Sequence, residues 1–119
     1  MTSSIQIDVT LDEQKMPASI AWKAPGGGVT EAQAAKAILL GLWDGAKEEA
    51  LRIDLWTSEM KVDEMADFFY QTLMGMADTY RRATRQTELS IEMADFAKSF
   101  QEKAQTAIRA SMDETGSNG

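Results

Sequence analysis

The chain has 119 residues, of which 44% are hydrophobic and 26% charged, as is typical of a single soluble globular domain. It contains neither cysteine nor histidine, which excludes disulfides, thiolate metal sites, thiol nucleophiles and hydrolases of the Ser-His-Asp type. The formal net charge of −7 opposes binding to a phosphate backbone, so we expect no nucleic-acid partner.

The first part of the chain alternates apolar and polar residues, which is the pattern of half-buried strands. Residues 5–11 alternate in this way, and residues 18–23 repeat the alternation after a short polar link. Two such segments with a short connection predict an antiparallel hairpin.

Three consecutive glycines, at positions 26–28, then break the second strand. A phosphate-binding loop would need Lys and Ser or Thr after them, and the chain has Thr30 and Glu31 instead, so these glycines predict a flexible joint. Thr30 and Gln33 have the spacing of a capping box, and apolar residues follow at helical intervals. We therefore expect a first helix over residues 30–42.

The densest aromatic region lies between residues 51 and 80. Residues 51–56 alternate and predict a third strand, and residues 62–80 carry an amphipathic helical pattern. A third helix is expected over residues 91–108, and the polar residues 111–119 are expected to form a disordered tail.

These elements predict an α+β fold in the order β-β-α-β-α-α. A small, mainly antiparallel sheet of three strands, in the order two-one-three, is expected to be covered on one face by the helices. We expect one domain over residues 1–110 and a tail over residues 111–119. Residues 1–6 lack the features of a signal peptide and no apolar run is long enough to span a bilayer, which predicts a cytoplasmic chain without membrane insertion.

The third strand and the methionines supply the candidate contact residues. Arg52, Asp54 and Trp56 are expected on the open face of the sheet, where they would meet a protein partner or a second copy of the chain. Met60 and Met74 belong to a group of methionines around the second helix, and methionine suits adaptable binding surfaces. The alternatives are an ordinary exposed strand face and core methionines that fill gaps.

Two charged groups have weaker functional interpretations. Asp63, Glu64 and Asp67 are candidates for a divalent cation site, but one helical turn aims too few oxygen atoms at a common point. Arg81, Arg82 and Arg85 are candidates for anion binding, but they also complement the negative end of a helix dipole. The sequence therefore predicts no metal, no cofactor and no catalytic residue.

A resemblance to a known family rests on residues 51–83. The strings LRIDLWTSEM, VDEM and FFYQTLMGMADTYRRA are similar to the GldC family, the gliding motility-associated proteins of Bacteroidetes-type gliding bacteria. Further similarity lies in residues 20–22, 31–38 and 42–44, whereas the triple glycine, Lys61 and the end after Ala104 depart from the family pattern. The resemblance implies a small soluble accessory protein of gliding motility, without known catalysis, whose partners are proteins of the gliding machinery.

Three functional hypotheses follow. The first is a non-catalytic accessory protein that acts through protein contacts, and the second is a chaperone-like or small-ligand-binding α+β module. A closed core would favour the first, and a large apolar groove would favour the second. The third, an enzyme that uses Asp with Arg or Tyr, would need a carboxylate pair in a deep cleft.

Overall fold

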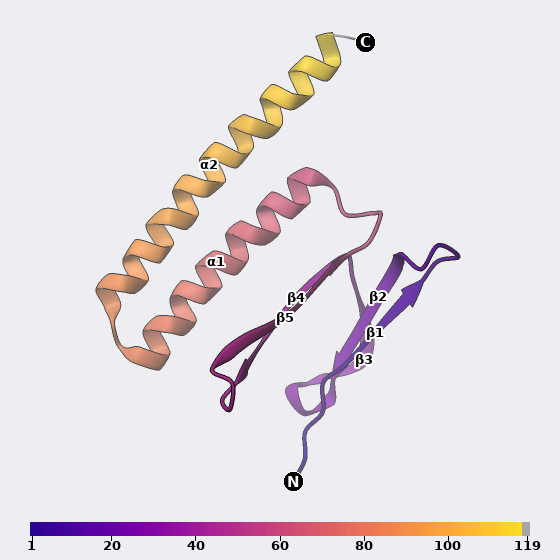
Figure 1. Cartoon of the computed structure of the whole chain (residues 1–119), viewed down its shortest axis with the longest axis vertical. Coiled ribbons are helices and arrows are strands. Elements are labelled where there is room, and N and C mark those ends of the chain that lie inside the picture. The colour runs from indigo at the N-terminus through magenta and orange to yellow at the C-terminus, as the bar shows by residue number, and fades with distance from the viewer. Residues whose placement is uncertain (118–119) are drawn as a thin grey trace. The chain divides into compact units, whose positions relative to one another are not determined.

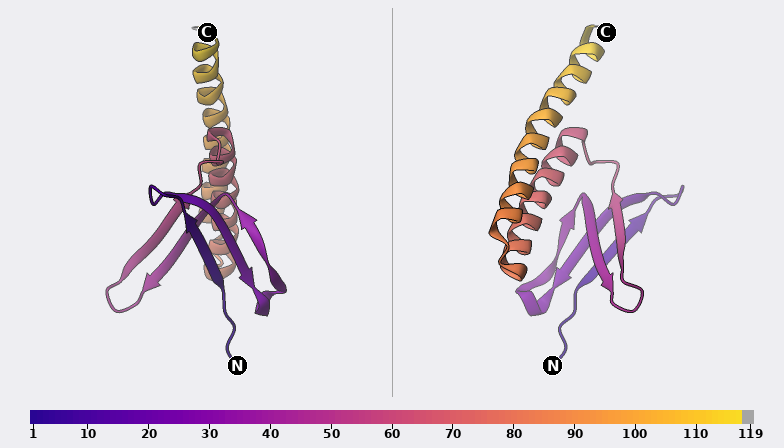
Figure 2. Two further views of the ribbon diagram at one scale, coloured as in Figure 1. Left: turned by 90° about the vertical axis from the view of Figure 1, so that its right-hand side faces the viewer. Right: turned by 60° about the vertical axis from the view of Figure 1, so that its left-hand side comes forward.

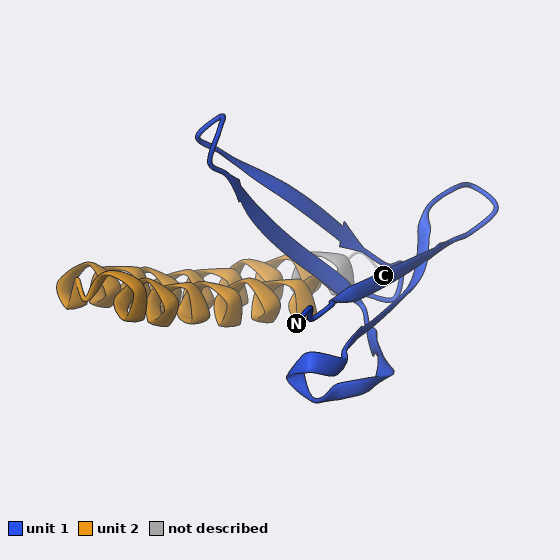
Figure 3. Ribbon diagram, turned by 90° about the horizontal axis from the view of Figure 1, so that it is seen from below, with its two compact units in different colours: residues 1–60 blue, residues 61–119 orange. Residues whose placement is uncertain are grey.

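The computed structural model describes the backbone of residues 1–117 and the side chains of residues 1–112. Within that part of the chain, strands come first and two helices follow, so the predicted α+β class is confirmed (Figure 1). The chain forms two compact units, Met1–Met60 and Lys61–Gly119 (Figure 3). The elements in chain order are β1 (Gln6–Leu11), β2 (Pro17–Ala24), the 3-10 helix η1 (Pro25–Gly27), β3 (Val29–Ala35), β4 (Ala37–Asp44), β5 (Glu49–Trp56), α1 (Val62–Thr84) and α2 (Thr87–Ser117).

The strands β1, β2 and β3 form an antiparallel sheet in that order. The hairpin of β1 and β2 is the one that the alternating pattern predicts. Ile20 of the central strand lies opposite Val9 on β1 and Ala35 on β3, and only 2% of its surface is exposed. Ile20 is therefore the centre of this small sheet.

The glycines after β2 form a hydrogen-bonded turn, where the sequence predicts a flexible joint. The backbone N–H of Gly28 donates to the carbonyl of Pro25 at 3.1 Å and closes η1. Gly28 has φ of 88°, a conformation that residues with a side chain rarely adopt. This turn leads directly into β3.

The strands β4 and β5 form a second, two-stranded antiparallel sheet (Figure 2). Their register runs without a shift from the pair Ala37 and Trp56 to the pair Asp44 and Glu49. At the open end of the hairpin, the backbone N–H and the hydroxyl of Thr57 both donate to the carbonyl of Lys36, at 2.8 and 3.0 Å. Thr57 is only 3% exposed, so this contact holds the two ends of the hairpin together.

The helix predicted over residues 30–42 is wrong, because β3 and β4 occupy these positions. A short apolar run fits both helical and strand patterns, and periodicity alone does not separate them. β4 pairs with β5 over eight residue pairs, and these tertiary contacts favour the strand over the helix because they override local propensity. The predicted strand order two-one-three is also wrong, because β5 pairs with β4 and β3 pairs with β2.

The helical unit is an antiparallel pair with small residues at its centre. Ala77 of α1 and Ala97 of α2 are 3% and 0% exposed, so the two backbones approach closely at these positions. The buried hydroxyl of Ser90 donates to the carbonyl of Ala77 at 2.7 Å and links the helices. Phe69 stacks on Phe100 with ring centroids 6.5 Å apart, which adds aromatic packing between the helices.

Local capping accounts for the limits of α1. The backbone N–H of Lys61 donates to the Glu64 carboxylate at 3.2 Å, as in the returning half of a capping box. At the other end, Arg85 adopts φ of 63° and its N–H donates to the carbonyl of Arg81, which closes the helix. Neither α1 nor the described part of α2 is long and apolar enough to cross a membrane.

The sequence predicts a single domain over residues 1–110 and a tail over residues 111–119. A single domain over residues 1–110, with helices covering one face of the sheet, stays a prediction. In the predicted tail, the helix α2 continues through to Ser117. Residues 118–119 lie outside the described part of the chain.

Candidate protein-contact surfaces

The β4–β5 hairpin has two chemically different faces. Successive side chains of a strand point to opposite faces, and residues directly opposite each other on β4 and β5 share a face. One face, called here the mixed face, carries the predicted residues Arg52, Asp54 and Trp56 together with Leu39 and Trp43 of β4. Trp43 is 69% exposed and Trp56 is 58% exposed. The structure thus places three of the five predicted contact residues on one accessible surface.

Arg52 and Asp54 form an ion pair on the mixed face. The Nε atom of Arg52 lies 2.8 Å from Oδ2 of Asp54, and their side chains are 75% and 42% exposed. Exposed pairs of this kind stabilise a fold only slightly. The pair therefore defines the charge pattern of the surface rather than the stability of the hairpin.

The opposite side of the hairpin, called here the aliphatic face, carries no charged residue at its centre. Leu42, Leu51 and Ile53 are 55%, 48% and 48% exposed. The sequence predicts Leu51, Ile53 and Leu55 as an inner face but misses the contribution of β4. Residues 37–43 are apolar without alternation, so they give no signal of which side chains share a face. The aliphatic face consists of Ile38, Leu40, Leu42, Leu51, Ile53 and Leu55.

Met60 and Met74, the other two predicted contact residues, are both half-buried. Met60 follows β5, and its backbone N–H donates to the carbonyl of Thr57 at 3.1 Å. Met74 lies on α1, in the helical unit. Met76 is the more accessible methionine of α1, with 52% of its surface exposed.

An apolar groove of about 430 Å³ lies between α1 and α2, and the sequence did not predict it. Phe96 and Leu89 are 61% and 46% exposed there, which leaves apolar surface open to solvent. The groove arises from the antiparallel pairing of the helices, so it could not be read from either helix alone. Its lining residues are Leu73, Tyr80, Leu89, Glu92, Met93 and Phe96.

A second groove, of about 590 Å³, lies between the start of α1 and the later part of α2. Val62 and Met112 are 73% and 68% exposed in it. A large apolar groove is the feature expected of the chaperone-like or small-ligand-binding alternative, so these two grooves favour it over a closed core. The lining of the second groove consists of Lys61, Val62, Asp63, Ala107, Ile108, Ser111 and Met112.

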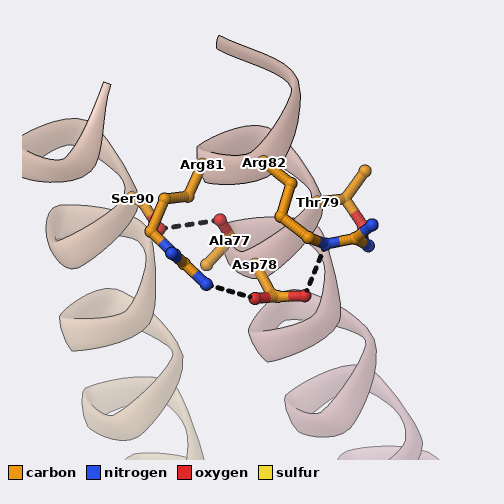
Figure 4. A network of polar contacts seen from close by, with 6 residues as sticks. All are labelled: Ala77, Asp78, Thr79, Arg81, Arg82 and Ser90. Carbon is orange, nitrogen blue, oxygen red and sulfur yellow. Dashed lines mark hydrogen bonds and ion pairs between the residues drawn. The ribbon is translucent and has the colours of Figure 1, made fainter. Parts of the chain in front are cut away.

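The arginines at the end of α1 bind a carboxylate of their own helix (Figure 4). Asp78 accepts hydrogen bonds from Arg81 and from Arg82, each at 3.0 Å. These hydrogen bonds lower the pKa of the Asp78 carboxyl below its ordinary value of 3.8. The hydrogen bond from Arg81 has the larger effect and that from Arg82 the smaller. The two guanidinium groups therefore bind within their own helix, which agrees with a structural role at the helix end rather than with anion binding.

Replacing Asp78 by asparagine should lower the melting temperature slightly at pH 7. Because the folded pKa lies below 3.8, the carboxylate stabilises the fold above the unfolded pKa. The stabilisation is lost as the pH falls below 3.8 and then through the folded pKa of Asp78. The difference in melting temperature between Asp78→Asn and the wild type should therefore shrink at low pH. Melting curves by circular dichroism at pH 7 and near pH 3 measure this, with Asp95→Asn as a control for the loss of one charge.

Asp63 and Glu64 lie in the first turn of α1, and Asp67 lies one turn further along. Among the described side chains, no group of three or more His, Cys, Asp or Glu is arranged to hold a metal ion. The expectation of no metal and no cofactor stays a prediction.

A family model described as gliding motility-associated protein GldC-like matches residues 17–106. The chain belongs to the GldC-like family. The resemblance read from residues 51–83 is thereby confirmed. No curated protein and no solved structure matches the chain.

The GldC-like match begins at the first residue of β2 and continues into α2. It includes the whole β4–β5 hairpin, both helices up to residue 106 and all five predicted contact residues. The family connects the chain with gliding motility. The hairpin and the groove of about 430 Å³ lie within the matched residues 17–106, whereas the groove of about 590 Å³ extends beyond them.

Proposed function

We propose that the chain is a non-catalytic, cytoplasmic accessory protein of gliding motility that acts by binding another protein of the machinery. The family supplies the association with gliding. The groove between α1 and α2 carries the contact part of the proposal, because exposed aromatic and aliphatic side chains there form one continuous recess. Exposed apolar patches on soluble proteins mark interaction sites.

The groove suits an amphipathic helix of a partner. Leu73 and Met93 contribute adaptable aliphatic side chains, and Phe96 and Tyr80 contribute flat apolar surface. A helix with apolar residues at intervals of three and four can insert such side chains into a groove of this kind. Glu92 at the lining adds a negative charge, which favours a partner with a basic residue beside its apolar stripe.

The non-catalytic part of the proposal draws on the sequence. Histidine and cysteine are absent from all 119 residues, which removes the commonest general base near neutral pH and the thiol nucleophile. A protein that acts by side-chain packing against a partner needs neither a general base nor a nucleophile. The enzymatic alternative would require chemistry from Asp, Arg or Tyr alone.

A pair of matched substitutions on α2 tests the contact. Leu89 lies in the groove and Ile91 lies two residues further along the helix, and both are substantially exposed, at 46% and 53%. Leu89→Arg should remove the proteins cross-linked to the chain in gliding cells and should reduce gliding speed, whereas Ile91→Arg should leave both unchanged.

Both substitutions lie at exposed positions, so both variants are expected to retain the helical signal of the wild type. Circular dichroism verifies this. The proposal is contradicted when Leu89→Arg glides at wild-type speed and retains the same cross-linked proteins. It is also contradicted when Leu89→Arg and Ile91→Arg lose these proteins equally, because the groove would then play no special part.

The second candidate function, a chaperone-like or small-ligand-binding module, is favoured by the groove of about 590 Å³. Unlike a dedicated accessory protein, such a module would suppress the aggregation of unrelated unfolded proteins or would bind small apolar probes tightly. Met112→Arg should abolish either activity, and Ile91→Arg is again the control. If neither activity is measurable in the wild-type chain, the second candidate is rejected.

A further inference from the structure

The strand β5 has an open edge that neither proline nor a bulge protects against pairing. Among the described residues, β5 pairs only with β4, so its other side offers unpaired backbone groups. Residues 37–44 and 49–56 contain no proline, and their register has no bulge, whereas both strand pairs of the other sheet contain a shift. Such an edge is a template for adding another strand.

The ladder of the hairpin shows which residues of β5 face this edge. In an antiparallel pair, residues that exchange both backbone hydrogen bonds alternate with residues that exchange none. Thr57 is of the first kind, because its N–H donates to the carbonyl of Lys36 at 2.8 Å. The register continues unbroken, so Leu51, Ile53 and Leu55 direct their peptide groups towards β4. Arg52 and Asp54 therefore direct theirs towards the open edge.

The sequence across this edge is complementary to itself. If two antiparallel copies of β5 meet around Ile53, Arg52 of each copy lies opposite Asp54 of the other. On the aliphatic face, Ile53 lies opposite its own copy and Leu51 lies opposite Leu55. Opposite charges and aliphatic pairs directly across a sheet are both stabilising.

We propose that the chain forms a two-fold homodimer by pairing of β5 with β5 of a second copy, centred on Ile53. The register is fixed by charge. A shift that centres the pair on residue 52 opposes Arg52 with itself, and a shift that centres it on residue 54 opposes Asp54 with itself. Shifts by an odd number of residues exchange the two faces and misalign the backbone groups. Of the registers centred on residues 52, 53 and 54, the one at Ile53 therefore satisfies charge, face and hydrogen bonding.

The pairing also relieves the weakness of the hairpin. A two-stranded sheet is marginally stable in water, and three or more strands with an apolar face are needed for independent stability. Pairing through β5 produces a sheet of four strands in the order β4-β5-β5-β4. Its aliphatic faces then join into one wider surface, on which Leu51 and Ile53, each 48% exposed in a single copy, meet aliphatic side chains across the new edge. This inference concerns a second copy of the chain and does not depend on the proposed gliding partner.

Two charge variants test the register, because each is predicted to fail alone and to recover in the mixture. Arg52→Asp places like negative charges across the edge, and Asp54→Arg places like positive charges there. Each variant should dimerise about tenfold more weakly than the wild type by sedimentation equilibrium. Mixed together, they restore both opposite-charge pairs and should form a heterodimer with nearly wild-type affinity. The intrachain ion pair is broken in both variants, so it does not account for the recovery.

Single cysteines give a second, independent readout, since the chain has no cysteine of its own. Ile53→Cys should form an intermolecular disulfide under mild oxidation, because the two-fold axis places the two thiols in directly opposite positions. Leu51→Cys and Leu55→Cys should each cross-link poorly alone, but a mixture of the two should cross-link.

The proposal is overturned by a wild-type chain that remains monomeric, by charge variants that do not recover on mixing, or by equal cross-linking at positions 51, 53 and 55. Circular dichroism and tryptophan fluorescence verify that each variant retains the fold. Unchanged dimer affinity in both charge variants would place the interface elsewhere and would equally reject the proposal.

Discussion

Replacing Ala97 by glutamate is expected to unfold the helical pair or to lower its free energy of unfolding by about 3–5 kcal/mol. Ala97 is 0% exposed on α2, which packs against α1. Glutamate is a good helix former, so the loss would come from a buried carboxylate and from steric overlap rather than from helix propensity. Urea unfolding followed by circular dichroism at 222 nm measures the change.

Ala110→Glu is the matched control, because it makes the same chemical change at an exposed position of the same helix. It should change the free energy of unfolding by no more than about 0.5 kcal/mol. Equal unfolding curves for Ala97→Glu and Ala110→Glu would contradict the close packing of the two helices at Ala97.

Replacing Ile20 by alanine should destabilise the three-stranded sheet by about 2–5 kcal/mol. Ile20 is 2% exposed and lies opposite residues of both neighbouring strands, so its truncation leaves a cavity at the centre of the sheet. The three tryptophans, Trp22, Trp43 and Trp56, all lie in the unit Met1–Met60, and their fluorescence reports on this unit. Ile5→Ala, at a position 75% exposed, is the control and should leave the fluorescence transition unchanged.

The two substitutions together test whether residues 1–110 behave as the single domain that the sequence predicts. Helical circular dichroism comes mainly from Lys61–Gly119, whereas tryptophan fluorescence comes from Met1–Met60. In a single cooperative domain, Ile20→Ala and Ala97→Glu would each shift both signals. Separate shifts, with each signal responding only to its own substitution, would show that the two units unfold independently.

Strands and helices with a clear period could be predicted from the sequence, and ambiguous ones could not. The alternation in residues 5–11 and 51–56 matches β1 and β5, and the amphipathic pattern after residue 62 matches α1. Residues 37–43 form a nearly continuous apolar run, and Thr30 and Gln33 before it have a spacing that resembles a helix cap. The strand β4 forms there because β5 supplies a partner in unbroken register, and that partner lies beyond any local sequence window.

Some of the candidate surfaces could be predicted from the sequence, and others could not. The exposure of Arg52, Asp54 and Trp56 follows from the alternation of one strand, so the sequence could indicate it. The groove at Leu89 and Phe96 requires the pairing of two helices, and the aliphatic face of the hairpin requires two strands. Features that depend on one element could therefore be predicted, whereas features shared between elements needed the structure.

The double hydrogen bond of Thr57 to Lys36 makes the hairpin a self-contained insert. Its entry and exit points adjoin each other, so the segment over residues 36–57 can be cut out and closed into a ring through a two-residue turn. Such a cyclic peptide would present the β5 edge in isolation and would compete with the intact chain for that edge.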